Sequence, residues 1–328
     1  MRVSVTEPLG QAIKRTTQIT FGPFDLGKWF VLGFSAWLAT LGDRKGFNFS
    51  YQSNHDPEHT ATATPRVGEV EEASQQASHW ITTHLPLVIT VGAVIALIFI
   101  AVVLLTSWVR SRAIFIFLDN LSKNQAAIVA PWKQFKSIGN SLFLFYIALG
   151  IIMFASYIAV FGLAAIVALP DIQAEHFGSL AITATVITVL LLLLLAFVFG
   201  ITIWCTNNFV VPLMYLRGQR VRLAWHEFRT ALLPGNVGAF VLFLLLQFVL
   251  RIATAIIGVM LGCITCCIGF LPYLNTVLTL PLYVFDRSYS IYFLEQFGQN
   301  YRIFQTIADP QKPTPPDALP PGTSSESS

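Results

Sequence analysis

LAITATVITVLLLLLLAFVFGITIW, residues 180–204, is the stretch that decides the fold of this protein. It contains no charged residue, and its centre is an unbroken run of leucines at 190–195. A helix needs about 20 apolar residues to cross the ~30 Å hydrocarbon layer of a bilayer. This stretch therefore predicts a transmembrane helix.

Similar apolar stretches recur along the chain. The segment 237–285 carries a single charge, Arg251, and is long enough for two crossings. We divide it near Gly262, Gly269 and Pro272, because glycine and proline interrupt helices. The sequence predicts an all-α, polytopic helical membrane protein with about six spans, at 29–42, 85–109, 142–169, 180–204, 237–260 and 268–285.

The composition of the whole chain agrees with this class. Of the 328 residues, 55% are hydrophobic and 11% are charged, whereas an average soluble domain is about 25% charged. So few charges cannot coat a soluble globule of this size. An ordinary cytosolic enzyme, a disordered chain and a nucleic-acid-binding protein are excluded on this ground.

The distribution of basic residues predicts the orientation. With six spans, 16 of the 20 Lys and Arg fall on one side, three (Arg44, Lys45 and Arg66) on the other, and Arg251 lies inside a span. Basic residues are retained on the cytoplasmic side, so both termini are expected inside a bacterial plasma membrane. The segment 29–42 is short, and its alternative is a re-entrant or interfacial helix that does not cross.

Three segments flank or interrupt the membrane domain, which we place at 29–308. Residues 1–28 are expected to be a cytoplasmic N-terminal segment. Residues 43–84 form a polar outer loop with too few apolar residues for a core. Residues 309–328 are rich in Pro and Ser and are expected to be a disordered cytoplasmic tail.

The chain carries a weak internal repeat. Trp132 and Phe135 precede the third span as Trp225 and Phe228 precede the fifth, each pair three residues apart and therefore on one face of a helix. The pattern predicts three helical hairpins, each entered through a short cytoplasmic amphipathic helix; the alternative is a recurrence of interfacial composition. The residues expected to reach lipid headgroups are Trp132, Lys133, Lys136, Trp225 and Arg229.

Arg251 is the most informative single residue, because ionisable residues inside a membrane are costly. No Asp or Glu lies within any predicted span. Its expected partners are therefore amides such as Gln247, Asn207, Asn208 or Asn275, backbone carbonyls, or a lipid phosphate. The two interpretations are a polar link between hairpins, which we favour, and a site for an anionic headgroup.

Other reactive residues form no recognisable catalytic or metal site. Cys263, Cys266 and Cys267 lie at the predicted outer turn; their flanks favour small packing residues, with a disulfide as the alternative. His55 and His59 are four apart, but Pro57 between them opposes a helix. We expect no catalytic residue, no metal and no cofactor.

The motifs at 23–34 and 115–120, the pair Pro131-Trp132, and the motif at 280–297 resemble those of a group of uncharacterised bacterial integral membrane proteins. That group is similar to the membrane domain attached to some glycerophosphoryl diester phosphodiesterases. The resemblance covers most of residues 8–305. It implies a multi-pass membrane domain, and it carries over no catalytic residue because the phosphodiesterase barrel is absent.

Two functions from different classes follow. The first is a non-enzymatic membrane protein that binds lipid, including anionic headgroups, or membrane protein partners in the cell envelope. The alternative is a transporter of small molecules or lipids built from repeated hairpins, for which polar residues at mid-membrane are typical. An enzyme acting within the bilayer ranks third.

Overall fold

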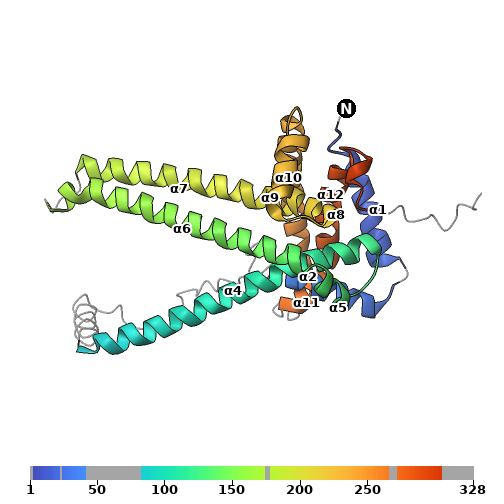
Figure 1. The fold of residues 1–328 in the computed structure, drawn as a ribbon, viewed down its shortest axis with the longest axis horizontal. Coiled ribbons are helices and arrows are strands. Elements are labelled where there is room, and N and C mark those ends of the chain that lie inside the picture. Colours follow the sequence, from blue (N-terminus) through green and yellow to red (C-terminus); the bar gives the residue numbers. More distant parts are fainter. Residues whose placement is uncertain (1–2, 23, 42–82, 174–177, 266–271, 305–328) are drawn as a thin grey trace, which may run out of the picture.

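The computed structural model describes residues 3–22, 24–41, 83–173, 178–265 and 272–304 (Figure 1). These residues form helices joined by short turns, and no strand occurs among them. The helices are α1 (Glu7–Phe21), α2 (Leu26–Thr40), α4 (Leu85–Lys123), α5 (Val129–Gln134), α6 (Lys136–Gln173), α7 (Ser179–Cys205), α8 (Val211–Arg217), α9 (Val221–Glu227), α10 (Val237–Thr265), α11 (Pro272–Leu278) and α12 (Leu280–Glu295). Two π-helical turns lie at Thr206–Val210 and Phe228–Leu232, and a 3₁₀ turn at Gln299–Tyr301.

Four of the described helices are long and apolar enough to cross a membrane. They run over Leu85–Lys123, Lys136–Asp171, Ile182–Arg217 and Val237–Leu261. Three of the six predicted spans, 85–109, 142–169 and 237–260, lie inside them, and a fourth, 180–204, does so except for its first two residues. The all-α class is therefore confirmed, and the protein carries helices suited to a membrane.

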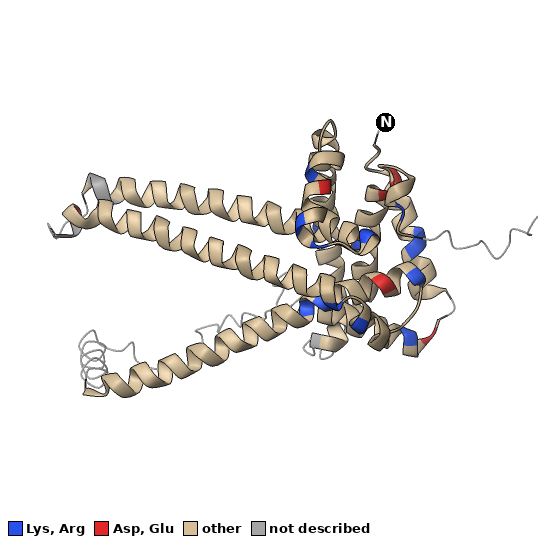
Figure 2. Ribbon diagram, viewed as in Figure 1, with Lys and Arg blue, Asp and Glu red and all other residues tan. Residues whose placement is uncertain are grey.

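The long helices α4, α6, α7 and α10 project from the rest of the molecule, and we call the projecting parts the arms. In Figure 1, α6 and α7 lie side by side, α4 diverges from them, and α10 runs across their direction. The most apolar windows of α4 and α6 contain no buried residue. Figure 2 shows that the charged residues gather at the foot of the arms, whereas α4, α6 and α7 carry almost none along their projecting lengths. This is the distribution expected when the arms face hydrocarbon and their foot faces water.

The foot of the arms is a compact base with its own core. The C-terminal half of α4 is buried there, from Ser111 to Ser122. Phenylalanines from four elements meet in the core, where Phe209 stacks on Phe228 with ring centroids 5.6 Å apart and contacts Phe243 and Phe293. Aromatic pairs at such distances add to the free energy of burial. The base is thus held together by specific side-chain packing.

Arg15 joins α1 to the end of α4. Its guanidinium is buried and donates to the carbonyl oxygens of Leu121 and Ser122, both at 3.0 Å, and it lies over the Phe304 ring. The last carbonyls of a helix have no partner within the helix, and a cation there also favours the helix dipole. The segment 1–28, expected as a simple N-terminal extension, therefore contains a helix built into the base.

The helix α2 covers residues 29–40 of the predicted span 29–42 and is only 15 residues long. It packs along the buried half of α4: Arg110 donates to the carbonyl of Ala39, and Lys28 to the side chain of Asn124. The segment thus runs beside residues 110–124 and not beside the apolar stretch 85–109. Gly33 on the buried face of α2 lies against α11, where a Cβ atom would come within 2.6 Å of a Val277 methyl group.

The predicted span 268–285 is wrong as a single helix. Its first four residues lie outside the described part, and the remainder is divided into α11 and α12 at Thr279, with α12 continuing ten residues past the predicted end. Pro281 explains the break, because proline has no N–H for the carbonyl of Val277. That carbonyl instead accepts the indole N–H of Trp29 at 2.9 Å.

Several predictions fall on residues that the structure does not describe. They include residues 43–82 of the outer loop, the tail 309–328, and the cysteines 266 and 267. Cys263 lies in the last turn of α10. The proposed disulfide therefore stays a prediction.

Candidate functional site: a cavity around Arg251

A cavity of about 770 Å³ opens where α7 and α10 meet the base. Its walls come from five helices, α2, α4, α7, α10 and α12. The polar and charged residues of the lining are Thr40, Arg110, Trp204, Asn207, Asn208, Gln247, Arg251, Thr254, Tyr283, Asp286 and Arg287. The predicted site residues Arg251 and Gln247 thus share one cavity.

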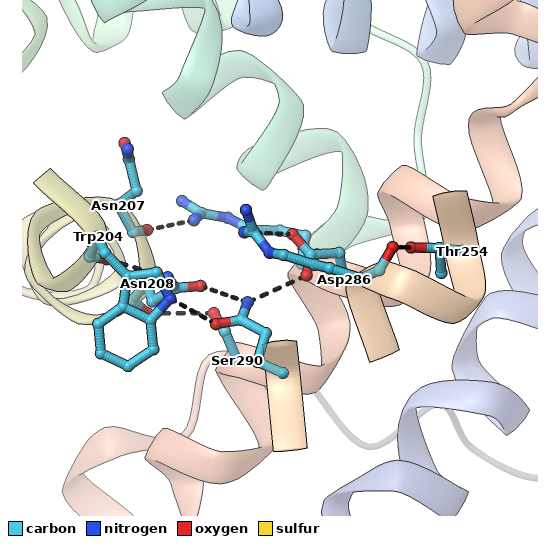
Figure 3. Close-up of polar contacts among 9 residues, drawn as sticks. Trp204, Asn207, Asn208, Thr254, Asp286 and Ser290 are labelled. Carbon is cyan, nitrogen blue, oxygen red and sulfur yellow. Dashed lines mark hydrogen bonds and ion pairs between the residues drawn. The ribbon is translucent and has the colours of Figure 1, made fainter. Parts of the chain in front are cut away.

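Gln247 is the centre of the polar network (Figure 3). Its side chain is 1% exposed, and its carbonyl oxygen accepts the indole N–H of Trp204 at 2.7 Å. Its amide nitrogen donates to Asn208 and to Asp286, each at 3.0 Å. Both ends of this buried amide are satisfied, so the network fixes α7, α10 and α12 relative to one another.

Arg251 pairs with a carboxylate that we did not predict. Its Nη2 lies 3.4 Å from Oδ2 of Asp286, and both side chains are partly exposed. The expectation that its partners are amides, carbonyls or lipid is corrected by this contact. The predicted span ended at Phe285 because Asp286 is charged; the helix continues through it, so the carboxylate faces α10.

The π-helical turn Thr206–Val210 supplies backbone acceptors to the same region. A π turn shifts the internal hydrogen bonds by one residue and is frequent at functional sites. The carbonyl of Asn207 accepts from Arg287, and that of Asn208 accepts the Ser290 hydroxyl at 3.1 Å. Tyr146 donates to the Asn207 side chain at 2.8 Å. The irregular turn therefore holds α12 against α7.

The cavity is electropositive. Three arginines, Arg110, Arg251 and Arg287, and one carboxylate, Asp286, line it, which gives a formal charge of +2 among the described lining residues. Two of the guanidinium groups also have spare donors: Nε of Arg251 and Nη2 of Arg287 are buried without a hydrogen-bond partner in the described part of the chain. A buried donor without a partner is unfavourable, and an anion would satisfy it.

The remaining wall of the cavity is apolar and opens to the side. Phe197 of α7 is 65% exposed, and Phe248 of α10 is 62% exposed. Both side chains belong to helices that are long and apolar enough to cross a membrane. The cavity therefore joins a cationic inner end to an apolar opening between two candidate membrane helices.

The other predicted site residues lie elsewhere. Two short helices occur at the expected places, α5 with Trp132 and α9 with Trp225, while Arg229 lies in the π turn that follows α9. The side chains of Lys133, Lys136 and Arg229 are exposed. None of these residues lines the cavity.

Trp132 has a further partner, Arg112. The guanidinium of Arg112 lies 4.1 Å from the Trp108 ring and 5.4 Å from the Trp132 ring, and it donates to Asn140 at 2.9 Å. Gly139 faces this arginine so closely that a Cβ atom would lie 2.8 Å from its Cγ. Such a cation between two indoles ties α5 to α4.

The chemistry of the cavity lining indicates which ligands would fit it. In the described part of the chain no group of three His, Cys, Asp or Glu residues comes together as a metal site. The cavity offers cations, amides and apolar surface, which together suit an anionic amphiphile. The structure is thus an all-α protein with four described helices suited to a membrane and a cavity at their foot.

The chain belongs to a family of unknown function, DUF7544, which matches residues 3–294. No curated protein and no solved structure was found to match the chain.

Proposed function

We propose that this chain is a non-enzymatic integral membrane protein that binds lipid or partner proteins in the cell envelope. The observation that carries the proposal is the pairing of apolar arms that the chain leaves uncovered with exposed cations at their foot. Uncovered apolar helices need hydrocarbon or another protein around them. The resemblance to the phosphodiesterase membrane domain agrees with such a role.

The short helices α5 and α9 are the proposed lipid-contacting elements of the base. Each carries a tryptophan and lies at the foot of a long helix. Lys133, Lys136 and Arg229 are exposed there, within reach of headgroup phosphates if the foot lies at the membrane surface.

Replacement of Lys133, Lys136 and Arg229 by Gln tests this role. The full chain, reconstituted in vesicles with and without phosphatidylglycerol, is expected to retain less of that lipid on purification after the triple replacement. Lys14→Gln, an exposed lysine of α1, is the matched control. Equal retention by the triple variant and wild type would contradict the proposal.

Transport is the second candidate, and the cavity at Arg251 is the observation that favours it. A transporter requires a site reachable from both sides of the membrane in turn. Uptake into sealed vesicles containing the reconstituted chain measures this. Release or uptake of a labelled anion that depends on Arg251 would favour transport over binding.

The proposal includes six spans in three hairpins, with both termini inside the plasma membrane. A non-crossing segment 29–42 would instead put residues 1–28 outside. Labelling of Lys14→Cys in intact cells by a membrane-impermeant maleimide, with Lys133→Cys as reference and the parent chain as background, separates the two. Six spans predict no labelling of either position. Labelling at position 14 alone would show that the segment 29–42 does not cross the membrane.

A further inference from the structure

We propose that the cavity around Arg251 binds the phosphate group of an anionic lipid, with the acyl chains leaving sideways between α7 and α10. The inference rests on the proposed lipid-binding function and assigns it a second, defined site. This site is separate from the exposed cations Lys133, Lys136 and Arg229. An experiment can therefore contradict one of the two sites and leave the other standing.

The charges of the cavity select the headgroup. Three arginines, Arg110, Arg251 and Arg287, line the cavity together with one carboxylate. A phosphate with one or two negative charges would neutralise the excess positive charge. The guanidinium group is the side chain best suited to phosphate because its donors lie in a planar fork. Nε of Arg251 and Nη2 of Arg287 are buried and have no partner among the described residues, so they would become donors to a phosphate if their side chains turn toward it.

Asp286 sets how readily Arg251 can change partners. Their separation of 3.4 Å is longer than the 2.7–2.9 Å typical of a strong charge-assisted hydrogen bond. Gln247 also donates to Asp286, so this carboxylate keeps a partner when Arg251 turns to another anion. The phosphate is thus expected to compete with Asp286 for Arg251.

The apolar opening distinguishes a lipid from a free anion. Phe197, Phe248 and Ile252 line the cavity and are 65%, 62% and 49% exposed. Inorganic phosphate would contact the arginines and leave these side chains uncovered, whereas acyl chains would cover them. Trp204 is the last residue of its predicted span and Arg110 directly follows the end of another, so this end of the cavity lies near the depth of headgroups.

Native mass spectrometry of the full chain in detergent tests the assignment. Dioleoyl phosphatidate and dioleoyl phosphatidylcholine, which share acyl chains, are titrated against wild type, Arg251→Gln, Arg287→Gln, Arg251→Lys and Asp286→Asn. Arg222→Gln, an exposed arginine outside the cavity, is the control. Inorganic phosphate and glycerol 3-phosphate serve as chain-free probes.

Wild type is expected to prefer phosphatidate. Loss of either arginine is expected to weaken that binding about tenfold, while Arg251→Lys keeps part of it and Arg222→Gln all of it. Asp286→Asn is expected to tighten it roughly tenfold by removing the competing charge. A purely structural Asp286 would give the opposite sign, and size-exclusion profiles show whether each variant is folded.

Three results would overturn the inference. Phosphatidate preference that survives both arginine replacements places the lipid elsewhere and leaves the proposed function standing. Binding of inorganic phosphate or glycerol 3-phosphate as tight as that of phosphatidate would assign the cavity to a free anion. Looser binding by folded Asp286→Asn assigns the ion pair to structure alone. The absence of any bound lipid would count against the proposed function itself.

Discussion

The arms and the base of this protein are built from the same kind of residue but are stabilised differently. Phe154 on α6 is 67% exposed, whereas Phe209, just past the end of α7, is fully buried against other rings. The arms have internal backbone hydrogen bonds, and apart from the pairing of α6 with α7 their apolar stretches are largely exposed. The base has a dense aromatic core and long-range hydrogen bonds such as that of Trp29 to Val277.

The difference shows what the surroundings contribute. Lipid tails are as apolar as leucine, so no hydrophobic force drives the arms together. Their helices persist because backbone groups must pair inside hydrocarbon. Replacements in the arms should therefore be mild, while those in the base should follow the rules of a soluble core.

Phe209→Ala is expected to have the largest effect, a loss of about 3–5 kcal/mol in the free energy of unfolding, because it leaves a cavity among packed rings. Phe154→Ala removes the same atoms from an arm and is expected to change the free energy by less than about 0.5 kcal/mol. Detergent unfolding followed by tryptophan fluorescence measures both. Similar losses would show that the arms are also packed against protein.

Trp29→Phe is expected to have an intermediate effect. The replacement keeps an aromatic ring but removes the indole N–H that the carbonyl of Val277 accepts in place of the N–H missing from Pro281. The unpaired carbonyl is expected to cost about 1–3 kcal/mol. Trp37→Phe, in the same helix, is the matched control and is expected to cost less. The same unfolding assay measures both, and an equal cost would remove the special role of this hydrogen bond.

Glu295 gives the smallest effect, a dependence of stability on pH. Burial raises the pKa of its carboxyl, although the backbone N–H groups of Phe304 and Ile303 and the nearby Arg302 and Arg15 oppose this. The folded state therefore holds the proton more tightly than the unfolded state. Its contribution is present below the ordinary glutamate pKa and is lost as the pH rises through the folded-state pKa.

Glu295→Gln isolates that contribution, because the amide oxygen can still accept both backbone N–H groups. The variant is expected to lose the decline in stability above the ordinary glutamate pKa that wild type shows. Melting temperatures from pH 4 to 7 measure it. A decline that persists in the variant would assign the titration to another group.

Local composition made the arms predictable. The leucine run at 190–195 needs no tertiary contact to specify a helix in lipid, and four of the predicted spans lie in long apolar helices. The polar site was predicted in part, since Arg251 and Gln247 stand out in an apolar stretch. Asn207 and Asn208, named as possible partners, do lie in the same cavity.

The rest depended on contacts between distant residues. The predicted span was ended at Phe285 because the next residue, Asp286, is charged. Asp286 was therefore placed beyond the end of a helix that in fact contains it. The break before Pro281 was missed because the carbonyl it frees is satisfied by Trp29, 248 positions away. Nothing in the composition of Thr206–Val210 signals a π turn. Apolar length is a local property, whereas pairing of polar groups is not.

The π turn at Thr206–Val210 also resets the phase of a helix. A π turn carries one residue more than the α-helical repeat, and an α-helix advances about 100° per residue. The faces of α8 are therefore rotated relative to those of α7. The apolar stretch of α7 is largely exposed, whereas the residues of α8 from Val211 to Met214 are all buried. Deleting the inserted position is therefore expected to turn every residue after Val210 by about 100° relative to α7, and to pull the side chains of α8 out of register with the core around them.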